Sequence, residues 1–406
     1  MKSDLKSFIS KRSYLFAILS IFSFFIPLAN SSAEDLIKIV SSLPRTGSSN
    51  PQTTTMVNAI NLAIEERGGK VGNFKIVYED WDDASPERGT WDPAVEAANA
   101  DKAIKDTDIM AMVGPFNSGA AKIAMPKTNQ SQLLLLSPAA SWPGLTKFGI
   151  GEPNEPKVYR PSGKINFFRV VPADDLQGAI AAKWAKELGT KKIFIVHDGE
   201  LYGKGLAGIV KKQSVALGLN VAGFEQIDPK AANYKSLAVK IKQQNPEVIF
   251  FGGLTQTNGG QLAKDVVAAG VNSKFIFPDG CFEKAFIDAA GKEVLEGRSY
   301  FTFGGVPPDK LTGKGEVFFK KYLAKFKSDP EVYSAYAYEA TNVILNAIEK
   351  VGKKDRAAIL EEVKKTKDFD GALGVWSFDE NGDTTSKTMS INSIKDGKFE
   401  FVKILD

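Results

Sequence analysis

Short apolar runs recur along the chain, and longer stretches with helical spacing separate most of them. Several runs consist of consecutive apolar residues, which is typical of strands buried on both faces of a parallel sheet. In one intervening stretch, Val57, Ile60 and Ile64 repeat every three or four positions, which predicts an amphipathic helix. The runs that we predict as strands are 37–43, 74–78, 109–113, 133–136, 167–171, 193–196, 221–224, 248–251, 275–277 and 300–303.

The alternation of strands and helices predicts an α/β fold in which right-handed crossovers join parallel strands. A chain of 406 residues is too long for one typical core, so we expect two α/β lobes. In such sheets ligand groups gather at the carboxyl ends of the strands, and candidate chemistry is expected there. The irregular stretch 141–164, rich in Gly, Pro and charge, is predicted to form a surface loop.

Residues 1–33 have the pattern of a secretory signal peptide. Basic residues at the start precede the apolar run 14–28, and small residues lead up to Ala33. We expect cleavage after Ala33, and for a bacterial chain this places the mature protein in the periplasm. A membrane anchor is the alternative, but the run is short for a span and Pro27 interrupts it.

Composition narrows the classes of partner. The net charge is +4, but residues 1–33 carry +3 of it, so the rest of the chain is nearly neutral. A nearly neutral surface argues against a nucleic-acid partner. Hydrophobic content of 43% and charged content of 25% are typical of a globular protein that is not embedded in a membrane. Cys281 is the single cysteine, so the chain has no internal disulfide.

Two strand ends in the first half of the chain offer groups for an anion. Asn117 and Ser118 follow the strand 109–113 and begin a helix, whose free N–H groups attract a carboxylate. Either residue could instead only cap that helix. The strand 133–136 is followed by Ala139, Ala140 and Ser141, whose small side chains leave backbone N–H groups approachable, although an ordinary Ser-Pro turn would look the same. The candidate anion-binding residues are therefore Asn117, Ser118, Ala139, Ala140 and Ser141.

Two further strand ends offer an acid and an aromatic ring. Asp174 follows the strand 167–171 and could pair with an ammonium group or cap the next helix. Tyr202 follows the strand 193–196, and we interpret it as a wall or lid over a ligand. The glycines of 203–208 have the spacing of a dinucleotide-binding loop, but they do not directly follow the strand as that loop requires. An exported α/β enzyme that uses these glycines or Asp174 is the alternative function.

Other catalytic arrangements are missing from the sequence. His197 is the only histidine, and no second His or Cys accompanies it as a metal ligand. The sequence contains neither a G-x-S-x-G elbow nor a G-x-x-x-x-G-K-[ST] phosphate loop. We therefore expect no metal, no cofactor and no enzymatic activity.

The four strand ends described above, in the order in which they occur along the chain, resemble those of the type I periplasmic binding proteins. The resemblance is in particular to the branched-chain amino acid ABC transporter substrate-binding proteins of the leucine/isoleucine/valine-binding type. The resemblance covers essentially all of the chain after residue 33 and includes Asp82-Asp83-Ala84, Pro278-Asp279-Gly280 and Phe369-Asp370-Gly371. It implies two Rossmann-like lobes with parallel-sheet cores, joined by three crossovers near 170–174, 300–304 and 374–378. The implied division is a signal peptide at 1–33, a first lobe at 34–171 and 304–374, and a second lobe at 172–303 and 375–406.

The resemblance also implies roles for individual residues. Ser118, Ala139 and Ser141 match positions that hold a ligand carboxylate, and Asp174 lies where several relatives have an acid. Tyr202 and Tyr333 match aromatic residues of the cleft. Thr257 falls at the position of the glutamate that holds the ligand ammonium in many relatives. Either Asp174 supplies that negative charge alone, or the ligand is not an α-amino acid. The role of the long segment 81–100 stays open.

The function that the resemblance implies is capture of a small polar metabolite in the cleft for an ABC importer. The binding protein would be a monomer whose closed form docks on the membrane permease. Branched-chain amino acids are the usual ligands of such proteins, and other amino acids, small amides and carboxylates stay open. A sensory ligand-binding domain is a further alternative, and it would need an attached membrane segment.

Overall fold

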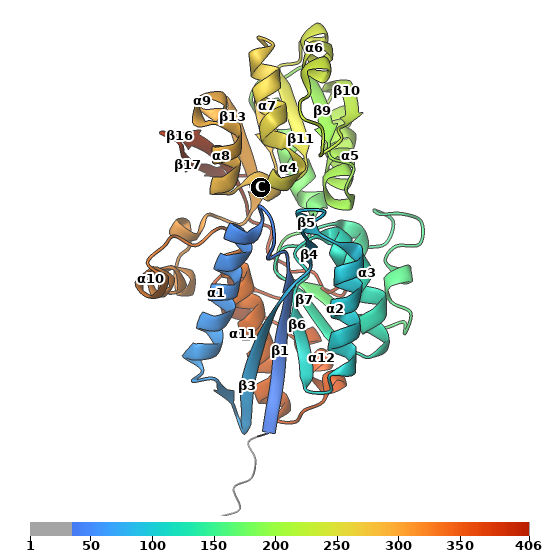
Figure 1. The fold of residues 1–406 in the computed structure, drawn as a ribbon, viewed down its shortest axis with the longest axis vertical. Helices are drawn as coiled ribbons and strands as arrows, with labels where there is room; N and C mark the ends of the chain where they lie inside the picture. The colour runs from blue at the N-terminus through green and yellow to red at the C-terminus, as the bar shows by residue number, and fades with distance from the viewer. Residues whose placement is uncertain (1–34, 406) are drawn as a thin grey trace, which may run out of the picture. The chain divides into compact units, whose positions relative to one another are not determined.

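The computed structural model describes residues 35–405, which form two lobes, each built on one β-sheet (Figure 1). The predicted signal peptide, 1–33, lies outside the described residues. Within residues 35–405, no helix has the length and apolar character needed to span a membrane. The α/β fold with two sheets agrees with the fold class that the sequence predicts.

The first lobe contains a six-stranded sheet in the order β2-β3-β1-β6-β7-β8. β2 runs antiparallel to β3, and the other neighbours are parallel. The strands are β1 (Asp35–Leu43), β2 (Lys70–Val71), β3 (Phe74–Asp82), β6 (Ile109–Val113), β7 (Leu134–Ser137) and β8 (Phe167–Arg169). The helices of this part are α1 (Asn50–Glu66), α2 (Pro93–Lys105), α3 (Ser118–Gln130), α10 (Lys314–Phe326), α11 (Ser334–Val351) and α12 (Arg356–Lys364).

The second lobe contains a seven-stranded sheet in the order β10-β9-β11-β12-β13-β16-β17. In this sheet β16 runs antiparallel to both of its neighbours, β13 and β17. The strands are β9 (Lys192–His197), β10 (Asn220–Gln226), β11 (Val248–Gly252), β12 (Lys274–Phe277), β13 (Ser299–Gly304), β16 (Met389–Lys395) and β17 (Lys398–Ile404). The helices are α4 (Asp174–Glu187), α5 (Leu201–Ala216), α6 (Lys235–Gln244), α7 (Gly259–Ala268), α8 (Lys284–Ala290) and α9 (Lys292–Leu295).

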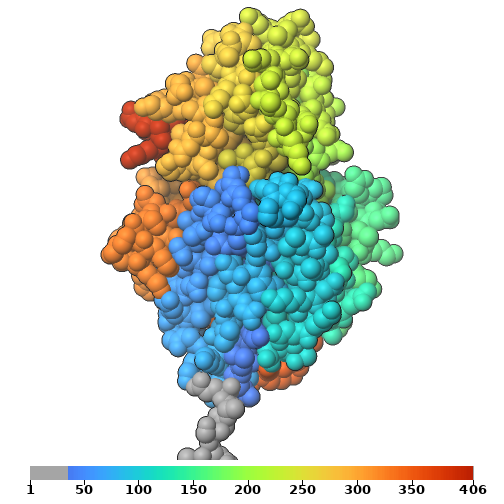
Figure 2. All heavy atoms as spheres, in the orientation of Figure 1, coloured from blue at the N-terminus to red at the C-terminus, as the bar shows by residue number. Residues whose placement is uncertain are grey.

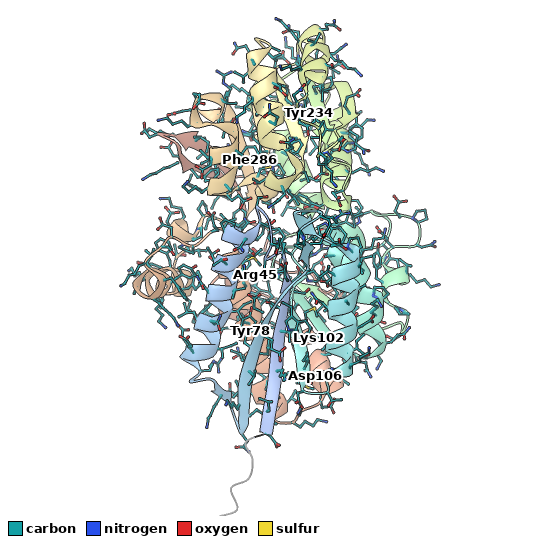
Figure 3. The ribbon with its side chains drawn as sticks, in the orientation of Figure 1. Arg45, Tyr78, Lys102, Asp106, Tyr234 and Phe286 are labelled. Atoms are coloured by element: carbon teal, nitrogen blue, oxygen red, sulfur yellow. The ribbon has the colours of Figure 1, made fainter. Side chains whose placement is uncertain are left out.

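Helices cover both faces of each sheet, which explains why the strands are apolar without alternation. In β1, Ile39 packs among residues of α1 and α11, whereas the next residue, Val40, packs among residues of α2 and α3. In the second lobe, Phe286 of α8 lies in the core under one face of the sheet (Figure 3). Eight of the ten apolar runs predicted as strands lie wholly in strands, whereas 133–136 and 167–171 extend beyond β7 and β8, and the helix predicted around Ile60 is α1.

Three passages of the chain connect the sheets. The first lies between β8 and α4, and the second begins at Gly304, where β13 ends. The third lies later than the expected 374–378. The stretch 378–384 still runs beside β8, where Asp383 forms a parallel bridge with Arg169, and β16 begins only at Met389. We therefore propose a last lobe boundary near residue 385, and the remaining lobe boundaries stay a prediction.

The stretch 141–164, expected to be a surface loop, has two parts. Its first six residues are buried and include the short 3-10 helix η1 (Pro143–Leu145). Most of the remaining residues are exposed or partly exposed, and they include η2 (Lys157–Tyr159). The buried part follows directly on β7, so it belongs to the strand ends rather than to the surface.

Candidate functional site

A cavity of about 20 Å³ lies where the carboxyl ends of strands from both sheets meet. Figure 2 shows the two lobes in contact around this level of the molecule. From the first lobe the lining residues belong to the start of α3, the turn after β7 and the start of α11. From the second lobe they belong to α5 and to the turns after β11 and β12. They are Phe116, Asn117, Ser118, Ala139, Ser141, Tyr202, Leu254, Gly280 and Tyr333.

The start of α3 supplies polar atoms that the helix itself leaves unused. Asn117 stands at the N-cap position, but its side chain makes no capping hydrogen bond. Its Oδ1 atom is buried and has no hydrogen-bond partner among residues 35–405. Ser118 is also buried, and its Oγ accepts the N–H of Trp142 at 3.1 Å. The side chain of Asn117 is therefore not simply a helix cap, and Ser118 joins the helix to the turn after β7.

The turn after β7 is held in one conformation by hydrogen bonds on each side. Ser137 Oγ accepts the N–H groups of Ala139 at 3.2 Å and Ala140 at 2.8 Å. The carbonyl of Ser141 accepts the N–H of Asp174 at 2.9 Å. Ala139 and Ser141 line the cavity, whereas Ala140 packs into the core on the α2 and α3 side of the sheet. Of the three predicted residues of this turn, two reach the cavity.

Asp279 is the residue of this site that the sequence reasoning missed. It begins the short 3-10 helix η4 (Asp279–Cys281) after β12 and is buried. Its carboxylate accepts the hydroxyl groups of Tyr202 and Tyr333 and also Gln177 Nε2 at 3.0 Å. Because Tyr333 belongs to the first lobe, this carboxylate joins the lobes beside the cavity. The signal was available, since Pro278-Asp279-Gly280 directly follows a predicted strand.

The two tyrosines stay neutral donors in this arrangement. Burial and the charge of Asp279 raise the pKa of the Tyr202 hydroxyl well above its ordinary value, and the same causes raise the pKa of Tyr333. The ring of Tyr333 also packs edge-on against Phe116, with ring centres 5.5 Å apart. Both rings therefore serve as walls of the cavity and as hydrogen-bond donors.

Asp174 is a second buried acid next to the cavity. It is the first residue of α4, it is fully buried, and neither carboxylate oxygen has a hydrogen-bond partner among residues 35–405. Burial, followed by the nearby charge of Asp279, raises the pKa of the Asp174 carboxyl well above its ordinary value. A buried carboxylate without partners is costly, which marks this residue as one that needs a cation or a proton.

Thr257 lies outside the cavity lining. It ends the 3-10 helix η3 (Thr255–Thr257), where its Oγ1 donates to the Leu254 carbonyl and accepts the Leu254 N–H, both at 2.9 Å. These bonds hold Leu254 in the lining. The next strand end, after β12, carries an acid, Asp279.

The glycines of 203–208 lie inside α5 rather than in a loop after a strand. A Cβ atom at Gly205 would overlap the ring of Trp142, and one at Gly203 would overlap the carbonyl of Gly252. The spacing thus allows α5 to pack closely on the first lobe and on β11. It does not form a phosphate-binding loop, and the enzyme alternative has no support here. No group of three potential metal-ligating side chains occurs within residues 35–405.

The long segment 81–100 braces the start of α3. It forms a small hairpin of β4 (Ala84–Ser85) and β5 (Thr90–Trp91), followed by α2. The ring of Trp91 lies so close to Gly119 of α3 that a Cβ atom there would overlap it. Arg88 reaches Glu200 of the second lobe at 3.3 Å. The segment therefore supports one wall of the cavity and contacts the opposite lobe.

Two α/β lobes, three connecting passages and a polar cavity at facing strand ends define a two-lobed ligand-binding protein. The family model described as "Periplasmic binding protein" matches residues 36–398. The chain belongs to the periplasmic binding protein family, whose members are extracytoplasmic solute-binding proteins rather than enzymes.

Individual relatives support the same assignment. The Leu/Ile/Val-binding protein BraC3 of Rhizobium johnstonii is 30% identical, over 92% of this chain and 95% of its own length. The leucine-, isoleucine-, valine-, threonine- and alanine-binding protein of Pseudomonas aeruginosa is 28% identical, over 91% and 92%. The crystal structure of the leucine-binding protein LivK from Thermotoga maritima superposes with a TM-score of 0.80 at 25% identity, covering 91% of this chain and 99% of that one.

Proposed function

We propose that this protein is the solute-binding component of an ABC importer and that it captures an aliphatic amino acid in the cavity between its lobes. The names of its relatives, the Leu/Ile/Val-binding protein BraC3 and the leucine-, isoleucine-, valine-, threonine- and alanine-binding protein, support this ligand class. The signal-peptide pattern of residues 1–33 supports a periplasmic location. We further propose that it works as a monomer and delivers its ligand to a membrane permease.

The observation that carries the proposal is that groups of both polarities gather at the cavity. The N-terminus of α3 and the hydroxyl of Ser118 line it and favour a carboxylate. Two buried acids lie next to lining residues: Asp279 accepts from Tyr202 and Tyr333, and Asp174 donates its N–H to the Ser141 carbonyl. A zwitterion can use both kinds of group, whereas a simple carboxylic acid or a simple amine can use only one.

The rest of the lining suits an apolar side chain. Phe116, Leu254 and the rings of Tyr202 and Tyr333 contribute apolar surface. Burying an aliphatic side chain against such surface contributes roughly 1.5–3 kcal/mol. The carboxylate and ammonium would thus fix the orientation of the ligand, and the side chain would add affinity.

The cavity is narrow in this arrangement, at about 20 Å³. We infer that loading of an amino acid involves separation of the lobes. We infer that the ligand first binds the open form at α3 and that the second lobe then closes with Tyr202. The ligand shifts the equilibrium toward the closed form because it makes contacts there with both lobes.

The proposal can be tested by calorimetry with three ligands of matched shape. L-Leucine carries both charges, 4-methylpentanoate lacks the ammonium, and 3-methylbutylamine lacks the carboxylate. We expect L-leucine to bind at least about 100-fold more tightly than 4-methylpentanoate or 3-methylbutylamine, because a ligand without the ammonium or the carboxylate leaves buried polar atoms of the protein unpaired. Equal binding of 4-methylpentanoate would exclude the amino acid assignment, and so would the failure of every protein amino acid to bind.

A further inference from the structure

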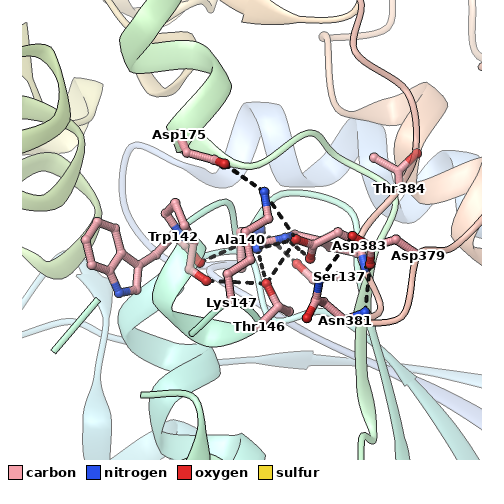
Figure 4. A network of polar contacts seen from close by, with 12 residues as sticks. Ser137, Ala140, Trp142, Thr146, Lys147, Asp175, Asp379, Asn381, Asp383 and Thr384 are labelled. Atoms are coloured by element: carbon pink, nitrogen blue, oxygen red, sulfur yellow. Dashed lines mark hydrogen bonds and ion pairs between the residues drawn. The ribbon is translucent and has the colours of Figure 1, made fainter. Parts of the chain in front are cut away.

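A network of polar contacts joins the turn after β7 to the stretch 378–384 (Figure 4), and Arg169 stands at its centre. Arg169 ends β8 and is fully buried. Its Nε donates to Asp383 Oδ1 at 2.7 Å, and one terminal nitrogen donates to Asp383 Oδ2 at 3.2 Å. The same nitrogen donates to Thr146 Oγ1. The ion pair joins the first passage between the lobes to the stretch 378–384 that precedes the third.

The remaining donors of Arg169 reach the turn itself. Its other terminal nitrogen donates to the carbonyl of Trp142 at 2.8 Å and to that of Ala140 at 3.3 Å. A guanidinium group has five N–H donors, and these bonds use all of them. Removal of any one of these acceptor oxygens would therefore leave a buried N–H donor of Arg169 unpaired. This arrangement is therefore specific to arginine, because a lysine ammonium has only three donors and no planar fork.

The bond to the Ala140 carbonyl determines the direction of the next N–H group. The peptide between Ala140 and Ser141 is trans, and in a trans peptide the carbonyl and the following N–H point in opposite directions. Since the Ala140 carbonyl points at Arg169, the Ser141 N–H points away from it. Ser141 lines the cavity, and within residues 35–405 its N–H has no hydrogen-bond acceptor.

We propose that Arg169 and Asp383 are positioning residues for ligand capture, which orient the Ser141 N–H toward the ligand carboxylate by fixing the carbonyls of Ala140 and Trp142. Asp383 neutralises and orients the guanidinium, and Arg169 holds the turn. The role depends on the proposed function, because the oriented N–H serves a ligand with a carboxylate.

The electrostatics of Asp383 agree with this role. Burial opposes ionisation, but the charge and the hydrogen bonds of Arg169 outweigh it and hold the pKa of the Asp383 carboxyl below its ordinary value. Lys147 adds a weaker contact at 3.7 Å and pairs with Asp175 of α4 at 2.8 Å. Asp383 thus remains a carboxylate at neutral pH, as the positioning of Arg169 requires.

The test compares Arg169→Lys with the full-length wild-type protein in L-leucine binding. Lysine keeps the positive charge beside Asp383 but cannot reach both carbonyls and the carboxylate. We expect at least about tenfold weaker binding, the scale of one lost hydrogen bond to a charged ligand group. Hydrogen exchange of the segment 137–146 should accelerate in the ligand-free variant, while exchange in α1 and α11 stays unchanged. Wild-type affinity with unchanged exchange would overturn the proposal.

Two further variants separate positioning from folding. The double variant Arg169→Met/Asp383→Leu replaces the ion pair with apolar side chains, so it should regain thermal stability over the single variants but not affinity for L-leucine. Recovery of affinity would also overturn the proposal. Arg160→Lys is the matched control, because Arg160 donates to Thr146 and Asn381 but not to the turn 139–142. Its affinity should stay within about twofold of the wild type. If the wild type itself binds no amino acid, the proposed function fails, whereas the exchange measurement still tests the role of Arg169.

Discussion

Two buried regions with ionisable side chains lie close together in the chain, and the fold stabilises them in opposite ways. One is the ion pair of Arg169 with Asp383, and the other is Asp174. Arg169 and Asp174 are only a few residues apart, and both are fully buried. Every donor of Arg169 has an acceptor, whereas neither oxygen of Asp174 has a donor in the part of the chain that the structure describes. The pKa of Asp383 is lowered and that of Asp174 is raised. The difference separates a charge that the fold compensates internally from an acid that it leaves without partners, which agrees with the proposed role of Asp174 toward a ligand.

The largest loss of stability is expected when the ion pair of Arg169 with Asp383 is broken. Asp383→Leu leaves Arg169 buried without its counter-ion, which should lower the free energy of unfolding by about 3–5 kcal/mol. Urea denaturation followed by circular dichroism measures this change. A loss below about 1 kcal/mol would mean that the pair is not structural.

A second prediction concerns two other acids whose pKa is raised by burial, Glu283 and Glu331. Burial raises the pKa of Glu283 to about 8 and that of Glu331 to about 7. Folded pKa values above the unfolded value mean that the folded protein binds more protons, so stability is fully present below about pH 4 and is lost as pH rises to about 8. At roughly 1.4 kcal/mol per pKa unit, Glu283 alone should lower the free energy of unfolding by about 3 kcal/mol from pH 5 to pH 8, and Glu331 should add to this fall. Melting temperatures across this range check the sign, and Glu283→Gln should flatten the profile.

Substitution of Asp174 should change the stability of the protein in the opposite direction to substitution of Asp383. Asp174→Asn removes a buried ionisable group that has no hydrogen-bond partner in the described part of the chain, so the ligand-free protein should gain stability at pH 8. The same change should weaken binding of L-leucine, because an amide cannot neutralise an ammonium group. Denaturation and calorimetry on one preparation measure both effects. A loss of stability would show that Asp174 has a structural partner and would remove the contrast with Asp383.

The smallest effect is expected at Thr257, whose hydroxyl is engaged by Leu254. Thr257→Val should lower stability by about 1 kcal/mol through the two lost local bonds. The affinity for L-leucine should stay within about twofold, because the side chain does not line the cavity. A tenfold loss of affinity measured by calorimetry would show that Thr257 belongs to the binding site.

The strand pattern was predictable because both faces of each sheet are covered, so continuous apolar runs mark the strands directly. The positions of Asn117, Ser118, Ala139, Ser141 and Tyr202 were predictable as well, because the ends of parallel strands meet at one edge. The choice between Thr257 and Asp279 was not. They follow the adjacent strands β11 and β12, and only the three-dimensional path of each turn decides which side chain reaches the tyrosines of the cavity wall.

The third passage between the lobes could not be located from sequence for a related reason. Residues 378–384 stay with the first lobe because Asp383 pairs with Arg169, 214 positions earlier in the chain. The ring of Phe378 adds a contact with Phe168, with ring centres 5.0 Å apart. Neither local propensity nor periodicity carries information about partners so distant in sequence.

The contacts between the lobes also have a kinetic consequence. If the lobes close over the ligand as proposed, its release can be no faster than the separation of the lobes. Contacts that cross the boundary, such as Tyr333 with Asp279 and Arg88 with Glu200, would then influence the residence time of the ligand even where they never touch it. A permease that pulls on this boundary would control the discharge of the ligand without competing for its binding groups.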